Sequence, residues 1–197
     1  MKREVVITAD GSSTIHLADW DEQYHSKHGA IQEAYHVFIK HGLHHYCHLE
    51  QKREESQKNK EDISILEIGF GTGLNAFITL LEAEKLNINI HYFGVEAYPV
   101  STDEIEQLNY PTQLQSEKNE LLFNKLHQVS WEEKHHISEH VSLTKQKKFF
   151  NEINDAQKFN LIYFDAFGAR VQPELWTEAI FENMYKALKP EGVLVTY

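Results

Sequence analysis

The chain has 197 residues, 41% of them hydrophobic, and a formal net charge of −11. This length fits one domain, or one domain with a small appendage. The acidic balance, most of it after residue 60, argues against broad nonspecific nucleic-acid binding, although it permits a small basic patch at the mouth of a site. The chain lacks an apolar run of membrane-spanning length, and its first residues lack the apolar region of a signal peptide. The single cysteine, Cys47, cannot form an intramolecular disulfide and leads us to expect a cytoplasmic protein.

The first fifty residues are expected to form an N-terminal extension. Two short strands, Glu4–Thr8 and Thr14–Leu17, flank an Asp10-Gly11 turn and indicate a hairpin. A polar loop covers residues 18–29. Apolar residues then recur at helical spacing from Ile31 to Ile39, and Gly42 is expected to end this helix.

Four histidines follow at the helical spacing i, i+3, i+4 and i+7, which places them on one helix face: His41, His44, His45 and His48. Such a face invites a metal-site interpretation. No acid completes an obvious zinc shell, although Cys47 is nearby, and a solvated helix end explains the same pattern. We therefore expect no metal.

A core domain is expected to span residues 63–197, after an almost entirely polar and charged linker at residues 51–62. It opens with a buried strand, Ile63–Ile68, three alternate glycines, and a helix from Leu74. Strand, glycine loop and helix form the first half of a nucleotide-binding βα unit. Glycine is needed where the chain turns sharply and a ligand touches bare backbone, and the helix points its amide end at that ligand.

The spacing of Gly69, Gly71 and Gly73 separates the classes of nucleotide loop. It is GxGxG, not the GxGxxG of dinucleotide enzymes or a Walker loop. With Glu67 two residues upstream, the string resembles motif I of the class I S-adenosylmethionine (SAM) methyltransferases. In that family the loop wraps the methionine part of the cofactor, whose ammonium suits a nearby carboxylate. An ordinary tight βα turn is the alternative.

A second acid strengthens the cofactor interpretation. Residues Ile88–Val95 are expected to form the next strand, and Glu96 stands at its end, 23 residues after Gly73. A carboxylate about 20 residues beyond the loop can accept both ribose hydroxyls of a nucleoside. An exposed acid at a strand end is the plainer explanation of Glu96 alone.

The second half continues to alternate strands and helices. Ser101 and Glu104 have capping-box spacing, so a helix is expected to start there and to end at Asn109-Tyr110-Pro111. The long segment Leu114–His140 is a candidate insertion for recognising substrate. The remaining elements are expected to be strand, helix, strand, helix and strand, at Val141–Leu143, Phe149–Ala156, Phe159–Phe164, Glu174–Leu188 and Val193–Tyr197.

This alternation predicts an α/β fold with a parallel sheet and helices on both of its faces. In such sheets the site lies at the carboxyl ends of the strands. Glu67, Glu96 and Asp165 fall at the ends of three different strands, so we expect them to gather at that edge.

The segment from Asp165 to Trp176 narrows the family. Its sequence, DAFGARVQPELW, resembles the D-G-F-x-P-x-x-N-P-x-x-W segment of the methyltransferase domain of MnmC-type tRNA-modifying enzymes. GFGTGLN at residues 69–75 and FGVEAYP at residues 93–99 match that family too, and Tyr24 and Glu33 sit where it has Y-F-S and E-T-R-Y-V-F. The similarity spans most of the chain. It departs at Ala169, which replaces a proline, and at Gln146 and Lys147, where many class I enzymes carry an adenine-binding acid.

The resemblance implies a Rossmann-like class I methyltransferase sheet with a small N-terminal extension, which we expect to be truncated after its fifth strand. It implies SAM-dependent methylation of the aminomethyl group of a modified wobble uridine in tRNA. Other implied partners are an oxidoreductase domain or an enzyme acting on the same nucleoside, and no membrane.

The resemblance also implies roles for individual residues. The cofactor-binding set is Glu67, Gly69, Phe70, Gly71, Gly73, Asn75, Glu96, Tyr24 and Glu33. Asp165 is the expected catalytic group, accepting a hydrogen bond from the amine, with a helix-capping role as its alternative. Two aromatic residues are expected to contact the uridine, with a place in the core as the alternative: Phe167 and Trp176. Four basic residues are expected to contact phosphates, with a solvated run of charges as the alternative: Arg170, Lys145, Lys147 and Lys148.

Three other functions remain open on the sequence alone. One is methyl transfer to a small amine, which the acidity would suit. Another is aminopropyl transfer, as in spermidine synthases, whose glycine loop usually carries an acid where this chain has Phe70 and Thr72. The third is a noncatalytic SAM-binding module.

Overall fold

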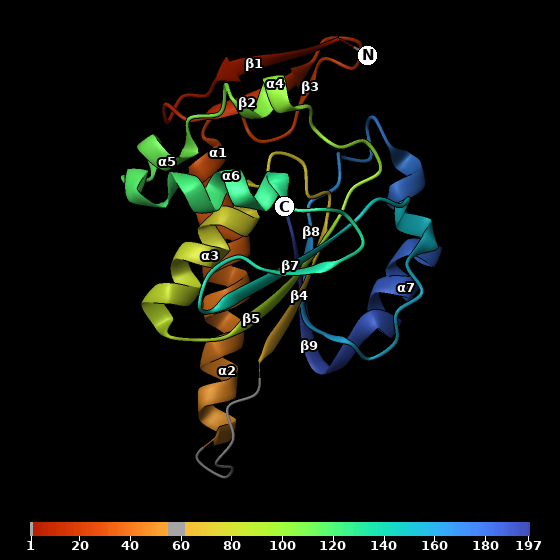
Figure 1. Ribbon diagram of the computed structural model, residues 1–197. Helices are drawn as coiled ribbons and strands as arrows, with labels where there is room; N and C mark the ends of the chain where they lie inside the picture. The colour runs from red at the N-terminus through yellow and green to blue at the C-terminus, as the bar shows by residue number, and fades with distance from the viewer. Residues whose placement is uncertain (1, 55–61) are drawn as a thin grey trace.

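The computed structural model describes residues 2–54 and 62–197 (Figure 1). Most of the expected linker at residues 51–62 therefore lies outside the described residues. A small antiparallel sheet has the order β1-β2-β3. Its strands are β1 (Arg3–Ile7), β2 (Ser13–Leu17) and β3 (Glu22–Gln23). The predicted hairpin is confirmed, and β3 extends it from the segment expected to be a loop.

The larger sheet has six strands in the order β6-β7-β5-β4-β8-β9. Their bounds in that order are Lys134–His136, Val141–Gln146, Ile90–Val95, Ile63–Ile68, Phe159–Phe164 and Leu188–Thr196. All neighbours are parallel except β6 and β7. The predicted α/β class is confirmed. Ile68 pairs with Val95 on one side and Phe164 on the other, so the residues that follow these strands share one edge.

Helices cover both faces of this sheet, with α3, α6 and η1 on one side and α7 on the other (Figure 1). The longer helices are η1 (Tyr35–His44, a π-helix), α2 (His45–Glu54), α3 (Leu74–Leu86), α6 (Glu120–Gln128) and α7 (Glu178–Ala187). The shorter ones are α1 (Ala30–Ala34), α4 (Thr102–Ile105), α5 (Tyr110–Gln113), η2 (Glu117–Asn119), η3 (Phe150–Glu152) and η4 (Pro173–Leu175).

The first long helix does not stop at Gly42, contrary to the expectation from sequence. Helical structure runs unbroken from Ala30 to Glu54. A Cβ on Gly42 would lie 3.1 Å from a ring carbon of Tyr163 and 3.2 Å from a methyl of Val195. The glycine therefore allows the helix to approach the sheet closely, and it has no capping role. The helical half of the expected extension covers the main sheet.

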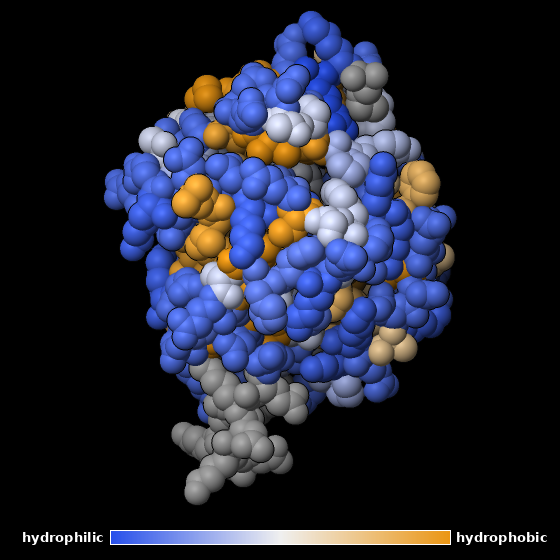
Figure 2. All heavy atoms as spheres, in the orientation of Figure 1, coloured by the Kyte–Doolittle hydropathy of each residue, from blue (hydrophilic) through white to orange (hydrophobic). Residues whose placement is uncertain are grey.

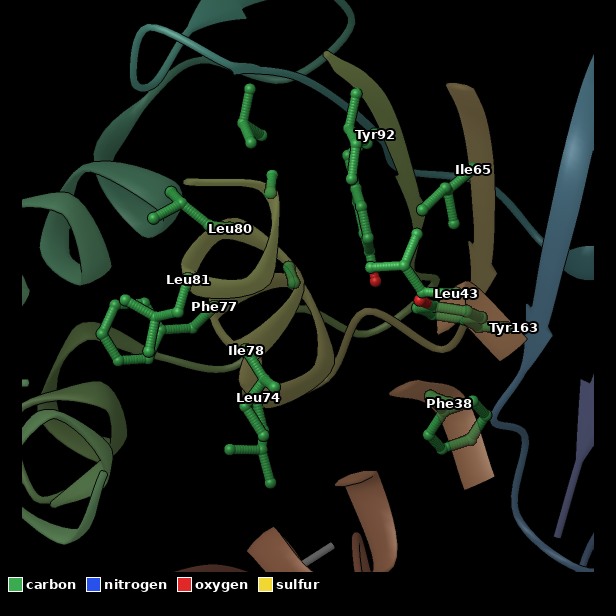
Figure 3. Close-up of a cluster of buried hydrophobic side chains, with 14 of the residues drawn as sticks. Phe38, Leu43, Ile65, Leu74, Phe77, Ile78, Leu80, Leu81, Tyr92 and Tyr163 are labelled. Atoms are coloured by element: carbon green, nitrogen blue, oxygen red, sulfur yellow. The ribbon is translucent and has the colours of Figure 1, made fainter. Parts of the chain in front are cut away.

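Two hydrophobic clusters lie on opposite sides of the main sheet. Along β8, Leu161 and Tyr163 face the cluster under η1 and α3, whereas Ile162 and Phe164 face the cluster under α7. Figure 3 shows the first cluster, in which Phe38 of η1 packs on Tyr163 with ring centroids 5.2 Å apart. Each large side chain buried in this way contributes about 1.5–3 kcal/mol.

Several predicted helices are shorter in the structure. The capping box of Ser101 and Glu104 is confirmed, but α4 ends at Ile105. The helix expected over residues 149–156 is only the turn η3, because the backbone of Ile153 is already extended. The helix expected from Glu174 begins at Glu178, after the turn η4.

The segment Leu114–His140, predicted as a candidate insertion for recognising substrate, forms part of the folded core. Phe123 and Leu126 of α6 are buried against α3, and β6 extends the sheet beyond β7. Hydrophilic side chains cover most of the face in Figure 2, with hydrophobic patches beneath the small sheet and beside α6. Within the described ranges, no helix is long and apolar enough to span a bilayer.

Candidate active site

A cavity of about 880 Å³ lies at the carboxyl edge of the main sheet, beneath the small N-terminal sheet. The loops after β4, β5, β7 and β8 contribute to its lining. Residues of the small sheet and the loop beside it also line it, namely Arg3, Leu17, Trp20 and Tyr24. This volume suits a nucleoside-sized ligand. No residue of the segment 114–140 lines the cavity.

The glycine loop between β4 and α3 presents bare backbone to this cavity. Gly69 has φ +88°, and a Cβ there would lie 2.5 Å from the Asp165 carbonyl oxygen. Gly71 has φ +48°, and a Cβ there would lie 3.0 Å from the Tyr24 ring. Both glycines line the cavity, whereas Gly73, with φ +72°, begins α3 behind them. Side chains at these positions would be strained and would occupy the cradle.

Glu96 joins the end of β5 to the glycine loop. Its Oε2 accepts a hydrogen bond from the Gly71 N–H at 3.0 Å, and its Oε1 accepts one from the Tyr98 N–H at 2.9 Å. The side chain is buried, yet Glu96 lines the cavity. Each carboxylate oxygen keeps a free lone pair, so the group can accept two hydroxyls of a ribose.

Asp165, at the end of β8, is held by a side-chain amide. The Asn75 Nδ2 donates to Asp165 Oδ2 at 2.8 Å and to Glu67 Oε1 at 2.9 Å. Burial raises the pKa of Asp165 to about 8, the Asn75 hydrogen bond opposes this, and Glu33 adds to it. A carboxyl that titrates near neutrality at a cavity wall is suited to proton handling.

Five of the nine predicted cofactor residues lie outside the cavity lining. Glu67 is 1% exposed, and burial, with Asp165 nearby, raises its pKa well above the usual value. The Phe70 side chain fills the space over Gly94 and packs on His127. Glu33 accepts the Ser26 N–H at 2.8 Å. The other two residues outside the lining are Gly73 and Asn75. The cavity lining contains the remaining four predicted cofactor residues, Gly69, Gly71, Glu96 and Tyr24.

The aromatic wall of the cavity comes from two distant segments. Phe167 packs edge-on against Tyr24 and Trp20, with ring centroids 5.1 and 5.7 Å apart. Trp176, expected beside the substrate, does not line the cavity. Its Nε1 donates to the Phe167 carbonyl at 2.8 Å and its ring packs on Phe164, so it supports Phe167 from behind.

The basic residues differ from one another. Lys145 is 1% exposed, its Nζ donates to the His127 carbonyl at 2.6 Å, and burial lowers its pKa to about 8. The expectation that Lys145 contacts phosphate from the surface is therefore wrong. Arg170 is exposed, but it binds the Glu22 carboxylate at 2.7 Å and the Asp21 carbonyl at 3.1 Å, fastening its loop to the small sheet. Lys147 is exposed and Lys148 partly so.

Several cavity residues escape sequence reasoning. Arg3 donates to the Tyr98 carbonyl at 3.0 Å, and Tyr98 pairs with Phe149, their ring centroids 5.9 Å apart. Two features of the sequence could have indicated these cavity residues. Tyr98 lies two residues after Glu96, and Trp20 is a large aromatic residue in a polar loop. Glu152 and Glu174 also line the cavity. With Glu96 and Asp165 they make four carboxylates against the one guanidinium of Arg3 in its lining, an arrangement that favours a cationic ligand.

The part of the chain that the structure describes lacks a set of metal-ligating side chains. Within the described residues, no group of three or more His, Cys, Asp or Glu side chains is arranged to hold a metal ion. The cradle, the strand-end acid and the acidic wall fit a nucleoside that carries positive charge, as SAM does.

Comparison with known proteins agrees with this site. Residues 109–197 match the sequence model of a family described as S-adenosyl-L-methionine-dependent methyltransferase. The crystal structure of MNMC2 from Aquifex aeolicus superposes with a TM-score of 0.75 at 27% identity, covering 100% of this chain and 59% of that one. The resemblance to the MnmC-type methyltransferases is confirmed. The fold is Rossmann-like, and SAM is the cofactor that the family match indicates.

Curated relatives extend the match. The tRNA 5-methylaminomethyl-2-thiouridine biosynthesis bifunctional protein MnmC of Leptospira interrogans is 28% identical over 189 residues, 90% of this chain and 28% of that protein. The protein of the same name from Campylobacter fetus is 28% identical over 152 residues, 71% of this chain and 24% of that protein. The chain thus spans about a quarter of the length of these curated relatives.

Proposed function

We propose that this chain transfers the methyl group of SAM to the aminomethyl nitrogen of a modified wobble uridine in tRNA. The observation that carries the proposal is Asp165, a carboxyl of raised pKa at the wall of an acidic cavity, beside a glycine loop and a strand-end acid. The printed name of the curated relatives, which specifies tRNA 5-methylaminomethyl-2-thiouridine biosynthesis, supports the choice of substrate.

The cofactor would be held by backbone and by one carboxylate. Gly69 and Gly71 offer bare backbone, Glu96 offers two acceptor oxygens for a ribose, and Tyr24 closes the cradle from the small sheet. When bound, SAM supplies a methyl group on a positively charged sulfur. The carboxylates that line the cavity stabilise positive charge in its vicinity.

Asp165 would handle the amine. The amine of the substrate must be neutral to form its bond to carbon. The N–C bond would form as the carbon–sulfur bond breaks, with the electron pair of that bond staying on the sulfur, and the nitrogen would be left with one proton in excess. The Asp165 carboxylate can accept a hydrogen bond from the amine, orient it, and take that proton. Its Oδ2 is already held by Asn75, which limits rotation of the group.

The uridine would lie against the aromatic wall. Phe167 forms the wall, Tyr24 and Trp20 pack against it from segments beside the small sheet, and the Trp176 Nε1 donates a hydrogen bond to the Phe167 carbonyl from behind. Lys147 and Lys148 remain the proposed phosphate contacts, because they follow β7 at the same edge and are at least partly exposed. We also propose that residues 63–197 form the cofactor domain and that residues 1–50 complete its cavity.

We propose that an oxidoreductase domain or enzyme acts on the same nucleoside, which the word "bifunctional" in the relatives' name supports. We propose a cytoplasmic location, since tRNA modification takes place there.

A second candidate is methyl transfer to a small amine. Four carboxylates line the cavity against one guanidinium, an arrangement that suits a small cation as well as it suits an aminomethyl group on RNA. Aminopropyl transfer would need decarboxylated SAM in the same cradle.

The experiment compares these substrates directly. The protein is incubated with SAM and with tRNA bearing aminomethyluridine, and the digested nucleosides are analysed by mass spectrometry. Gain of one methyl group on that nucleoside supports the proposal. Binding of SAM with an unchanged nucleoside, alongside methylation of putrescine or spermidine, would favour the small-amine alternative, and tighter binding of decarboxylated SAM than of SAM would favour aminopropyl transfer.

A further inference from the structure

A buried amide bridges two carboxyl groups behind the wall of the cavity. Asn75, the second residue of α3, is 2% exposed and does not line the cavity. Its amide nitrogen has two hydrogens, and the structure pairs them with Glu67 Oε1 and Asp165 Oδ2. These two acids end adjacent parallel strands, β4 and β8. One side chain thus joins a helix to two strand ends.

The orphaned atoms of this cluster point to a closed unit. Among the described residues, Asn75 Oδ1 is buried without a hydrogen-bond partner, and the Glu67 carboxyl group and the Tyr92 hydroxyl lie close to each other without forming a hydrogen bond of regular geometry. All three belong to side chains at most 2% exposed. None of the three side chains lines the cavity. Asn75 and Glu67 therefore act on a ligand only through a third residue, and Asp165 is the member of the cluster that lines the cavity.

We propose that Asn75 is a positioning residue that orients Asp165 for its work on the amine, with Glu67 anchoring the other side of the amide. The inference rests on the proposed function. It replaces the expectation that Asn75 and Glu67 touch the cofactor. By donating to Oδ2, Asn75 directs the second oxygen of Asp165 to the substrate.

Charge balance explains why the bridge is an amide. Two ionised carboxylates on neighbouring strand ends would repel each other, so one is expected to remain neutral. Glu67 is the more deeply buried, and burial raises its pKa well above the usual value. An amide N–H can donate to a carboxyl oxygen in either protonation state, so both hydrogen bonds persist whether Asp165 holds or has lost its proton. An aspartate at position 75 would instead add a third carboxyl group.

The groups that influence Asp165 come from several elements. They are acids or phenols on β4, α1, β5, α5 and the C-terminal end of the chain, namely Glu67, Glu33, Tyr92, Tyr110 and Tyr197. Arg3 is the cation that lines the same cavity, and its guanidinium is bound to the carbonyls of Tyr98 and Pro99. The Asn75 hydrogen bond is thus the contact on Asp165 that favours its ionised form.

The first test needs no methyl transfer. In protein labelled with ¹³C at aspartate carboxyls, the Asp165 resonance is titrated in the parent, in Asn75→Ala and in Asn75→Ser. Loss of the bridge should raise the pKa of Asp165 by about one unit or more, and the serine hydroxyl should restore part of it. The matched control is Asn160→Ala, because Asn160 is also a buried asparagine with two side-chain hydrogen bonds, to Tyr46 and from Ser64. An Asp165 pKa that is equal in parent and Asn75→Ala would overturn the proposal.

Glu67→Gln tests the neutral anchor. It replaces a neutral acid by a neutral amide, so the Asp165 pKa should shift by less than about half a unit. A large downward shift would mean that Glu67 is ionised in the parent and would contradict the anchor.

The second test uses single-turnover methyl transfer to tRNA at several pH values. In the parent, the rate of methyl transfer should rise with pH as Asp165 loses its proton. In Asn75→Ala this rise should occur at a higher pH, displaced by the same amount as the Asp165 pKa measured in the carbon titration. The rate above this rise should fall about tenfold, and SAM affinity should change less than about threefold. Equal loss of SAM affinity would make Asn75 a cofactor residue. If the parent transfers no methyl group, the proposed function fails, while the carbon titration still decides whether Asn75 holds Asp165.

Discussion

Glu96 and Asp165 occupy equivalent places, each directly after a buried parallel strand, yet the chain holds them differently. Glu96 receives two backbone N–H groups, from Gly71 and Tyr98. Asp165 receives one side-chain amide, from Asn75, and lies near two other carboxyl groups. The two backbone N–H groups fix the position of the Glu96 carboxyl group, as a cofactor ligand requires. A side-chain amide among acids leaves a group that can take and give a proton. Position at the sheet edge therefore brings an acid to the site, and burial, neighbouring carboxyl groups and hydrogen-bond donors together decide its chemistry.

We expect the largest effect on methyl transfer from a substitution of Asp165. Asp165→Asn keeps the size of the side chain and removes its charge and one acceptor. We expect single-turnover methyl transfer to fall by two to four orders of magnitude, roughly the contribution of a positioned acid–base group. SAM affinity should change far less. Near-normal transfer would reduce Asp165 to a structural role, and the comparison with Glu96 would lose its basis.

Gly69→Ala tests how closely the glycine loop approaches the backbone that follows β8. The new Cβ would meet the Asp165 carbonyl oxygen at 2.5 Å, at a φ of +88°. We expect a loss of about 2–4 kcal/mol in the free energy of unfolding, measured by urea titration. Gly168→Ala is the control, since its Cβ would meet its nearest neighbour only at 3.9 Å. Equal stability of the two variants would contradict the close approach of the glycine loop to β8.

Glu96→Gln tests the other carboxylate. The glutamine keeps one acceptor oxygen but sets an NH₂ group against a backbone N–H that Glu96 now accepts. We expect SAM affinity, measured by calorimetry, to fall about 10- to 100-fold, with the rate at saturating SAM changed less. An unchanged dissociation constant would remove Glu96 from the cofactor site.

The smallest effect is expected at the rim. Replacing Lys147 and Lys148 together by Ala should weaken tRNA binding a few-fold and lower the slope of log K against log salt by about one to two. Arg170→Ala is the matched control, because Arg170 is committed to Glu22 and to backbone carbonyls. If Arg170→Ala lowers the slope and the lysine pair does not, the RNA path lies on the other side of the cavity.

The sequence predicts both carboxylates because strand ends of a parallel sheet meet at one edge, and apolar runs such as Phe159–Phe164 mark those strands well. It cannot predict what surrounds them. The donor to Asp165 is 90 residues away, and the spacing of Asn75 from the glycines is explained equally well by cofactor contact. The prediction for Gly42 failed for the same reason. In the sequence, a glycine that lets a helix pack closely against Tyr163 cannot be distinguished from a glycine that ends a helix.

Local patterns also fail where tertiary contacts reassign a charged or aromatic residue. Lys145 stands in a basic run, but its alternate position in β7 points it into the interior, over the Trp131 ring. The cavity roof cannot be predicted from the hairpin, because nothing local to Arg3 or Trp20 places them over Tyr98 and Phe167.

The difference between the two acids is tested most directly by counting protons when SAM binds at pH 7. The pKa of Asp165 is about 8, so the group is mostly protonated in the empty cavity. A sulfonium nearby favours the anion and lowers that pKa, so binding should release protons. The heat of binding is measured in buffers of different ionisation enthalpy, with S-adenosylhomocysteine, which lacks the sulfonium charge, as the comparison. We predict release of roughly half to one proton with SAM, clearly less with S-adenosylhomocysteine, and none with either ligand in Asp165→Asn. Heats of SAM binding that do not depend on the buffer in the parent protein would contradict the account.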